Sequence, residues 1–166
     1  DDVWATFSMP GTGHLVGRRD ENGWKITPDP EGVLTNWPHH MVANADTVHI
    51  ASHGQDHDAN TGFVQLTTYQ NGRWSSQRVA EGDQPFQVRI ALRRDGVPVV
   101  AFARSDGIRV VELRDGRAAP LGDGDLMAWK GLASTVDLAV DDRDRVCVAF
   151  NAQDIRYRRV GVVCHR

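Results

Sequence analysis

The chain of 166 residues is long enough for one domain with a sizeable core. Hydrophobic residues make up 40% and charged residues 25%, as in ordinary globular proteins, and a net charge of −3 gives no basis for a nucleic-acid or membrane-surface partner. No apolar run approaches the roughly 18 residues that a membrane span requires, and the chain opens at Asp1 without a methionine, so we expect residues upstream of it.

The first predicted unit contains three strands. Val3–Phe7 is rich in β-branched and aromatic residues, as in a strand buried on both faces. Gly13–Val16 predicts a second strand, and Asn22-Gly23 is a strong hairpin signal that leads into a third. Nothing before Val3 supplies the opening strand that the later units have.

The second and third units each contain four predicted strands. Their fourth strands follow the hairpin signals Asn71-Gly72 and Asp115-Gly116. Their first three strands are predicted over Met41–Ala43, Val48–Ser52 and Gly62–Gln65, and over Val88–Leu92, Val99–Phe102 and Gly107–Val110.

The fourth unit does not close neatly. Its strands are predicted over Thr135–Val140, Val146–Phe150 and Asp154–Tyr157, which leaves only Val162–His165 at the end of the chain. This tail can complete the fourth unit or supply the strand that the first unit lacks, but it cannot do both.

The four units repeat with a regular period. The matching alanines Ala5, Ala51, Ala101 and Ala149 are separated by 46, 50 and 48 residues, and we expect all four to be buried. Blades of β-propellers have periods of about 40–50 residues and four antiparallel strands.

The predicted fold is therefore all-β, without a convincing helix. It is a single repeat domain over 1–166, with about four four-stranded antiparallel meanders as β-propeller blades near 1–32, 33–82, 83–125 and 126–166. A plain β-sandwich is the alternative. Because repeat arrays have unsatisfied faces at their ends, we expect the chain to be part of a larger propeller, or to be completed by self-association or a partner chain. A self-contained four-bladed ring is the second choice.

The two cysteines, Cys147 and Cys164, leave two alternatives open. They can form one disulfide or remain two inert thiols inside a sheet. No close pair of cysteines indicates a thiolate metal site.

Two unusual stretches map to one rim of the predicted propeller. This rim carries the connections between blades and the loops between second and third strands, where ligands usually bind. Pro28–His40 is a long blade connection. Ser52–Gly62 is an insertion, because 11 residues separate the matching alanine from the next strand there, against 8, 6 and 5 in the other units.

Five of the seven histidines lie between His39 and His57, and three hypotheses compete for them. His39, His40 and His53 can act as acid and base, because the ordinary histidine pKa lies close to neutral pH. His53, His57 and Asp56 can bind a divalent metal, although no further cofactor is expected. The third hypothesis is that they are polar loop residues together with a packed His49.

Aromatic and basic residues suggest a ligand site on the same rim. Trp37 and Trp129 fall in blade connections, where an indole face can stack on a sugar ring. Arg104 can pair with an acidic ligand group. Trp24 and Trp74 follow hairpin glycines at equivalent places, which favours packing between blades.

The residues from Pro38–Met41 through Thr47–Gly54 resemble the repeat of sialidase-type (BNR-like) propellers, particularly the branch of ulvan-type polysaccharide lyases and related rhamnosidases. The Asn-Gly segments that precede Trp24 and Trp74 are similar to degenerate Asp-box turns. The resemblance implies one histidine at the start of an innermost strand and another after the next strand, both facing one pocket. His39 or His40, together with His53, match these positions.

Three functional hypotheses follow. The first is a carbohydrate-binding module that holds a saccharide or another polar small ligand on the blade-connection rim, with Trp37, Asp56, His57, Arg104 and Trp129 as ligand-binding residues. The second is a lyase or glycosidase acting on an acidic polysaccharide with loop histidines as acid and base. The third is a protein-interaction scaffold that uses open blade edges. We expect an extracellular or cell-envelope location.

Overall fold

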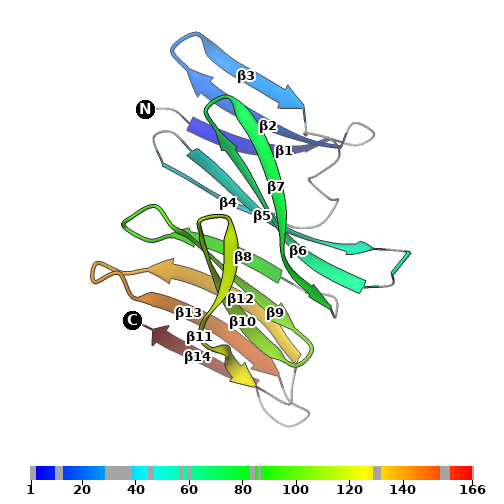
Figure 1. The fold of residues 1–166 in the computed structure, drawn as a ribbon, viewed down its shortest axis with the longest axis vertical. Coiled ribbons are helices and arrows are strands. Elements are labelled where there is room, and N and C mark those ends of the chain that lie inside the picture. The colour runs from blue at the N-terminus through cyan, green and yellow to red at the C-terminus, as the bar shows by residue number, and fades with distance from the viewer. Residues whose placement is uncertain are drawn as a thin grey trace.

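The computed structural model describes residues 3–9, 13–28, 39–44, 47–56, 58–59, 61–82, 85, 87–128, 132–153 and 158–165. Within these ranges the regular structure consists of strands only, as predicted, arranged in four antiparallel sheets (Figure 1). No helix long and apolar enough to cross a membrane occurs in the part of the chain that is described.

The strands follow one another as meanders, each sheet keeping the order of the chain. The first sheet contains β1 (Val3–Met9), β2 (Gly13–Asp20) and β3 (Gly23–Pro28). The second contains β4 (His39–Ala43), β5 (Thr47–Asp56), β6 (Thr61–Gln70) and β7 (Arg73–Gly82). The third contains β8 (Gln87–Leu92), β9 (Pro98–Arg104), β10 (Gly107–Arg114) and β11 (Arg117–Ala128). The fourth contains β12 (Leu132–Val140), β13 (Val146–Gln153) and β14 (Arg158–His165).

The predicted hairpin turns have the backbone that their residues favour. Asn71 and Gly72 have φ angles of 52° and 76°, and Asp115 and Gly116 have 52° and 71°. Two successive positive φ angles match the twist of the flanking strands, and Asn-Gly and Asp-Gly adopt them at low cost. These local turns determine the strand pairing within each blade.

The sheets pack face to face in chain order, with an apolar cluster between each successive pair. Val16 meets Val48 and Ile50 between the first and second sheets. Ala51, Val64 and Leu66 meet Val88, Ile90 and Phe102 between the second and third. Ala101, Ala103 and Val110 meet Val136, Val148 and Phe150 between the third and fourth. Each sheet is therefore a propeller blade, and the all-β propeller prediction is confirmed.

The matching alanines are not all buried. Ala51 and Ala101 are fully buried, but Ala5 and Ala149 are only half-buried. Trp4 and Val16 face the second sheet, so Ala5, one residue from Trp4, lies on the opposite face of β1. Ala149 likewise lies on the face of β13 that points away from the third sheet. The prediction is wrong for these two, because each lies on an outer face of a terminal sheet.

Trp24 and Trp74, both predicted to pack between blades, differ in their positions. Trp74 contacts Tyr69, which in turn contacts Trp4, with ring centroids 4.9 Å and 5.4 Å apart. These rings fill the space between the first and second sheets. Trp24 instead lies on the outer face of the first sheet and is 46% exposed, so the prediction for this residue is wrong.

The end of the chain completes the fourth sheet. β14 pairs with β13 along eight residues, from Arg158 opposite Gln153 to His165 opposite Val146. This register places Cys147 opposite Cys164, and the two form a disulfide. The tail therefore does not supply the strand that the first sheet lacks. The predicted strand over 154–157 lies outside the described residues, and the first and fourth sheets have three described strands rather than four.

The outer faces of the terminal sheets carry exposed apolar side chains. They are Val3, Trp24 and Ile26 on the first sheet, and Val160 and Val162 on the fourth. The two sheets lie at opposite ends of the molecule in Figure 1.

Candidate ligand-binding site

The strand directions define two rims. The blade-connection rim is where β4 begins at His39, β5 ends at Asp56 and β8 begins at Gln87. The turn rim is the opposite one, with the hairpin turns at Asn71-Gly72 and Asp115-Gly116.

Three polar residues occupy the same position in three successive innermost strands. His40 lies opposite Ala51, Arg89 opposite Ala101, and Asp137 opposite Ala149. We call His40, Arg89 and Asp137 the inner-strand cluster. Because β4, β8 and β12 are the first strands of their blades, their equivalent residues converge at the inner edge of the stacked sheets.

The members of the inner-strand cluster interact electrostatically. Arg89 Nε lies 3.5 Å from Asp137 Oδ1. Burial lowers the pKa of His40 below its usual value, the positive charge of Arg89 lowers it further, and the charge of Asp137 raises it. The cluster therefore holds one cation and one anion beside a neutral imidazole.

The hydrogen bond of His40 determines what its ring can do. The backbone N–H of Ile90 donates to His40 Nδ1 at 3.2 Å. Because an amide N–H can only donate, Nδ1 carries no proton, and the neutral ring carries its proton on Nε2. His40 is thus a hydrogen-bond donor whose single lone pair is already used.

A cavity of about 360 Å³ adjoins Arg89 and Asp137, and we call it the inner cavity. Gln87 belongs to its wall, and its Oε1 accepts a hydrogen bond from the Val136 N–H at 2.9 Å. Asn151 Oδ1 is buried in this wall and accepts no hydrogen bond from any residue that the structure describes. The remaining lining is Thr135, Val136, Ala149, Phe150 and Val160.

A buried acceptor without a donor is costly. Because Asn151 Oδ1 is closed to solvent in this structure, a ligand hydroxyl in the inner cavity would reach it only after the Asn151 side chain turns toward the cavity. The inner cavity thus offers both signs of charge, hydrogen-bonding groups and the small apolar surface of Ala149 and Val160. This combination suits a polar molecule that also has C–H faces.

The predicted histidines are brought together on one sheet. His39 pairs with Ser52, but its side chain lies outside what the structure describes. His40 and His53 lie on the same face of the second sheet, two residues apart in register, because His40 pairs with Ala51. His53 is only 2% exposed, and burial lowers its pKa. Its ring is covered where β5 packs toward the third sheet.

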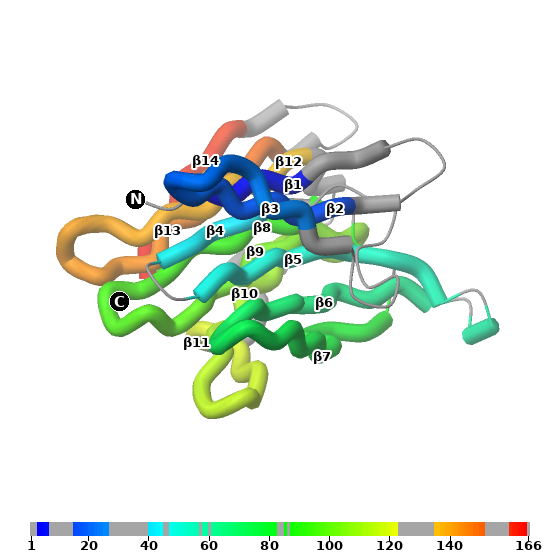
Figure 2. Tube along the Cα trace, turned by 90° about the horizontal axis from the view of Figure 1, so that it is seen from above, coloured from blue at the N-terminus to red at the C-terminus, as the bar shows by residue number. Residues whose placement is uncertain are grey.

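The insertion over Ser52–Gly62 is a strand extension rather than a loop. β5 and β6 continue to pair as far as Asp56 opposite Thr61. Figure 2 shows this hairpin extending out at one side of the molecule. The added residues alternate and pair as an ordinary ladder, so the insertion lengthens two strands.

Asp56 is held by its own hairpin. Its carboxylate accepts a hydrogen bond from the Ala59 N–H at 3.2 Å and lies 3.2 Å from the Arg78 guanidinium. The Ala59 hydrogen bond and then Arg78 lower the pKa of Asp56. The two-residue alternation of β5 places Asp56 and His53 on opposite faces, and the described residues contain no group of three possible metal ligands.

Arg104 lies against the second sheet rather than in the inner cavity. It is nine-tenths buried, its guanidinium lies close to Gly82, and its Nε lies 3.5 Å from Asp106. Trp37, His57 and Trp129 lie outside the described residues. Their proposed roles stay predictions.

Sequence reasoning did not single out Arg89, Asp137 or Asn151. A signal for the first two was present, because His40, Arg89 and Asp137 precede the matching alanines by 11, 12 and 12 residues. Aligning the units on the innermost strands would have placed all three at one level. No equivalent signal in the sequence pointed to Asn151, whose Oδ1 accepts no hydrogen bond from the part of the chain that is described.

No protein-family model and no curated protein matches the chain. Among solved structures it is similar to a β-propeller, an exo-1,5-alpha-L-arabinanase from a bovine ruminal metagenomic library, with a TM-score of 0.51 and 12% sequence identity. The match covers 99% of this chain and 66% of the arabinanase chain. At this identity the likeness concerns the fold, and the chain spans about two thirds of that protein.

Proposed function

We propose that this chain is a carbohydrate-binding β-propeller module whose ligand occupies the inner cavity. The observation that carries the proposal is the buried Oδ1 of Asn151, which accepts no hydrogen bond from the described residues and belongs to the same wall as Arg89 and Asp137. Sugar hydroxyls can donate to Asp137 and accept from Arg89, and a further hydroxyl can donate to Asn151 once its side chain turns toward the cavity. Hydroxyl-rich ligands are therefore better matched than apolar ones.

The charge balance favours a neutral sugar. Arg89 Nε and Asp137 Oδ1 lie 3.5 Å apart, and the Asp137 side chain is 76% exposed, so their charges largely offset one another at the solvent-facing edge of the cavity. A carboxylate ligand would gain from Arg89 but would be repelled by Asp137. The similarity to an exo-1,5-alpha-L-arabinanase makes α-1,5-linked arabinan oligosaccharides the first probe.

The state of the two histidines supports binding over acid–base catalysis. His40 Nδ1 already accepts from Ile90, so the ring has no lone pair left to take a proton from a substrate. His53 is covered by protein. A lyase or glycosidase that uses this pair would have to reorganise both rings.

Glycan-array screening followed by isothermal titration calorimetry tests the proposal. We expect a neutral oligosaccharide to bind at millimolar concentration or tighter, and Arg89→Gln and Asn151→Ala each to weaken it about tenfold, the loss of one good hydrogen bond. Arg143→Gln, an exposed arginine on the turn rim, is the matched control and should bind like the parent.

Two results would contradict the proposal. One is the absence of any bound saccharide on the array. The other is unchanged affinity in both Arg89→Gln and Asn151→Ala. Product release from arabinan or a uronate polysaccharide, lost in His40→Ala or His53→Ala, would establish the enzyme hypothesis instead.

We further propose that additional blades, from self-association or a partner chain, cover the terminal sheets. We also propose that the protein is located outside the cell. The exposed Val162 and the apolar face of the first sheet support additional blades, and the disulfide is typical of oxidising compartments. Size exclusion with light scattering tests self-association. A mass above that of one chain is the expected result, and a strict monomer would contradict self-association.

A further inference from the structure

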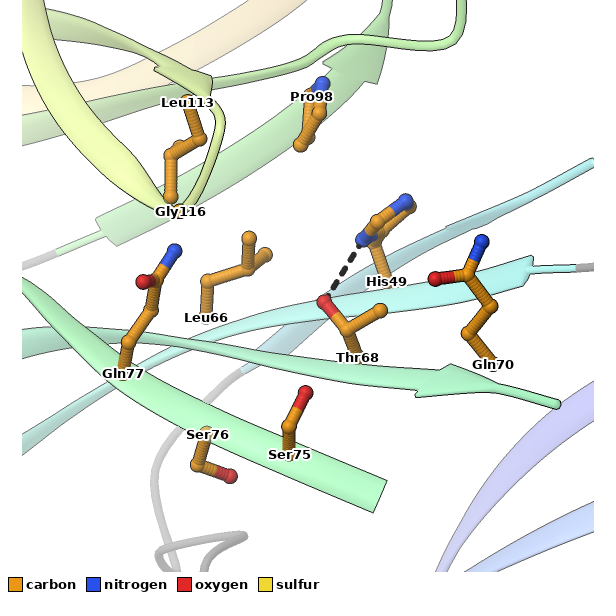
Figure 3. A pocket seen from close by; sticks show the side chains of 10 residues that line it. All are labelled: His49, Leu66, Thr68, Gln70, Ser75, Ser76, Gln77, Pro98, Leu113 and Gly116. Atoms are coloured by element: carbon orange, nitrogen blue, oxygen red, sulfur yellow. Dashed lines mark hydrogen bonds between the residues drawn. The ribbon is translucent and has the colours of Figure 1, made fainter. Parts of the chain in front are cut away.

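A second cavity lies between the second and third sheets, toward the turn rim. It has a volume of about 330 Å³ and shares no residue with the inner cavity. Figure 3 shows its lining, which comes from β5, β6 and β7 on one side and from β9, β10 and the following turn on the other. We call it the inter-sheet cavity. It is lined by His49, Leu66, Thr68, Gln70, Ser75, Ser76, Gln77, Pro98, Leu113 and Gly116.

One polar row crosses the second sheet at this level. His49 pairs with Thr68 on β6, and Thr68 pairs with Ser75 on β7. Paired residues project to the same face, so all three are directed toward the third sheet. Figure 3 shows His49, Thr68 and Ser75 gathered on one side of the cavity.

Blade packing does not require polar residues here. The residue equivalent to His49 in the third sheet is Val99, two positions before the matching alanine, and it is fully buried in the apolar cluster against the fourth sheet. In the second sheet the same position carries an imidazole and its neighbours carry hydroxyls. The polar row therefore departs from the apolar pattern that packs the third sheet against the fourth.

The cavity has an apolar floor and a polar mouth. Leu66, Pro98 and Leu113 are buried, whereas Gln70 and Ser75 are exposed. An apolar surface facing hydroxyl and amide groups matches the two sides of a sugar ring.

His49 is the buried polar group of the site. It is 8% exposed, and its Nδ1 lies 2.9 Å from Thr68 Oγ1 (Figure 3). Burial lowers its pKa, so the ring is neutral at pH 7. None of the described residues that line this cavity carries a formal charge at that pH.

We propose that the inter-sheet cavity is a second binding site, for a neutral, hydroxyl-rich molecule of monosaccharide size. Its volume lies at the lower end of the range for small-molecule sites, about 300–1,000 Å³. The uncharged lining would disfavour a charged sugar, because nothing in it replaces the water around a carboxylate. The proposal rests on the polar row and stands apart from the function assigned to the inner cavity.

Backbone amide NMR provides the test, with L-arabinose, D-galactose and D-glucose as neutral probes and D-glucuronate as the charged one. We expect at least one neutral sugar to shift the amides of Thr68, Ser75 and Gln77 in a saturable manner. D-glucuronate should shift them at least tenfold less at equal concentration.

Two substitutions remove groups from the polar row with little change of shape. Ser75→Val places a β-branched side chain in the exposed mouth, and Thr68→Val removes the hydroxyl beside His49. Each should weaken the neutral sugar about tenfold or more. The matched control is Thr61→Val, which makes the same hydroxyl-to-methyl change at an exposed residue at the far end of β6, outside the cavity lining.

Arg89 lines the inner cavity but not the inter-sheet cavity. Arg89→Gln should therefore leave the sugar-induced shifts of the Thr68, Ser75 and Gln77 amides unchanged, which distinguishes the two sites. The proposal is overturned if none of the three neutral sugars shifts these amides at about 50 mM, a concentration that would detect even a weak millimolar site. It is also overturned if binding persists unchanged in both Ser75→Val and Thr68→Val. If saccharides bind at the inter-sheet cavity but not at the inner cavity, only the proposed function is refuted.

Discussion

Ala101→Leu is the most direct test of how the blades pack. Ala101 is fully buried between the third and fourth sheets, within the cluster that includes Val110, Val136 and Val148. Leucine adds three carbon atoms where the sheets leave no space, so neighbouring side chains must leave their preferred rotamers. Overpacking of this kind costs roughly 1–3 kcal/mol.

The same substitution at Ala149 is the matched control. Ala149 occupies the equivalent place in the fourth sheet, but it lies half-buried on the outer face, with the exposed Val162 paired beside it. Ala149→Leu should change the free energy of unfolding by no more than about 0.5 kcal/mol, as for an ordinary surface substitution.

Urea unfolding followed by tryptophan fluorescence and far-UV circular dichroism measures both variants. Ala101→Leu should lower the midpoint with an unchanged m-value and should lower the melting temperature by about 2–4 °C per kcal/mol. Equal effects at the two positions, or an unchanged midpoint in Ala101→Leu, would show that this face of β9 does not pack against the fourth sheet.

Two further predictions concern stability. The double variant Cys147→Ser, Cys164→Ser removes a disulfide between residues that are 17 positions apart. In urea titrations this should lower the free energy of unfolding by about 3 kcal/mol, and a change below about 1 kcal/mol would contradict the prediction. Burial lowers the pKa of His40, His49 and His53 below the usual 6.5, so below pH 6.5 the unfolded chain binds protons that the folded chain excludes. The free energy of unfolding should keep its full value above pH 6.5 and should fall as the pH drops below 6.5, less steeply in His53→Gln. A urea midpoint that does not change as the pH drops below 6.5 would contradict the assignment.

The arrangement within each blade was largely predictable from the sequence. Asn71-Gly72 and Asp115-Gly116 specify tight turns, and a tight turn sets the register of the strands that it joins. The same reasoning predicted an offset of two residues between His40 and His53, and the pairing of His40 with Ala51 has this offset. These features depend on neighbours in the chain, so local residues are enough to encode them.

The relations between blades were decided by tertiary structure. Arg89 and Asp137 are 48 positions apart in the chain and meet only because the third and fourth sheets stack at a particular angle. The burial of Arg104, the burial of the Asn151 oxygen and the space beside His49 likewise depend on which side chains the next blade presents. Strand periodicity predicts which face of its sheet a residue occupies, but it does not predict which residues of the neighbouring sheet pack against that face. The sequence therefore encodes the blades through local hairpins, while both candidate sites arise from packing between distant segments.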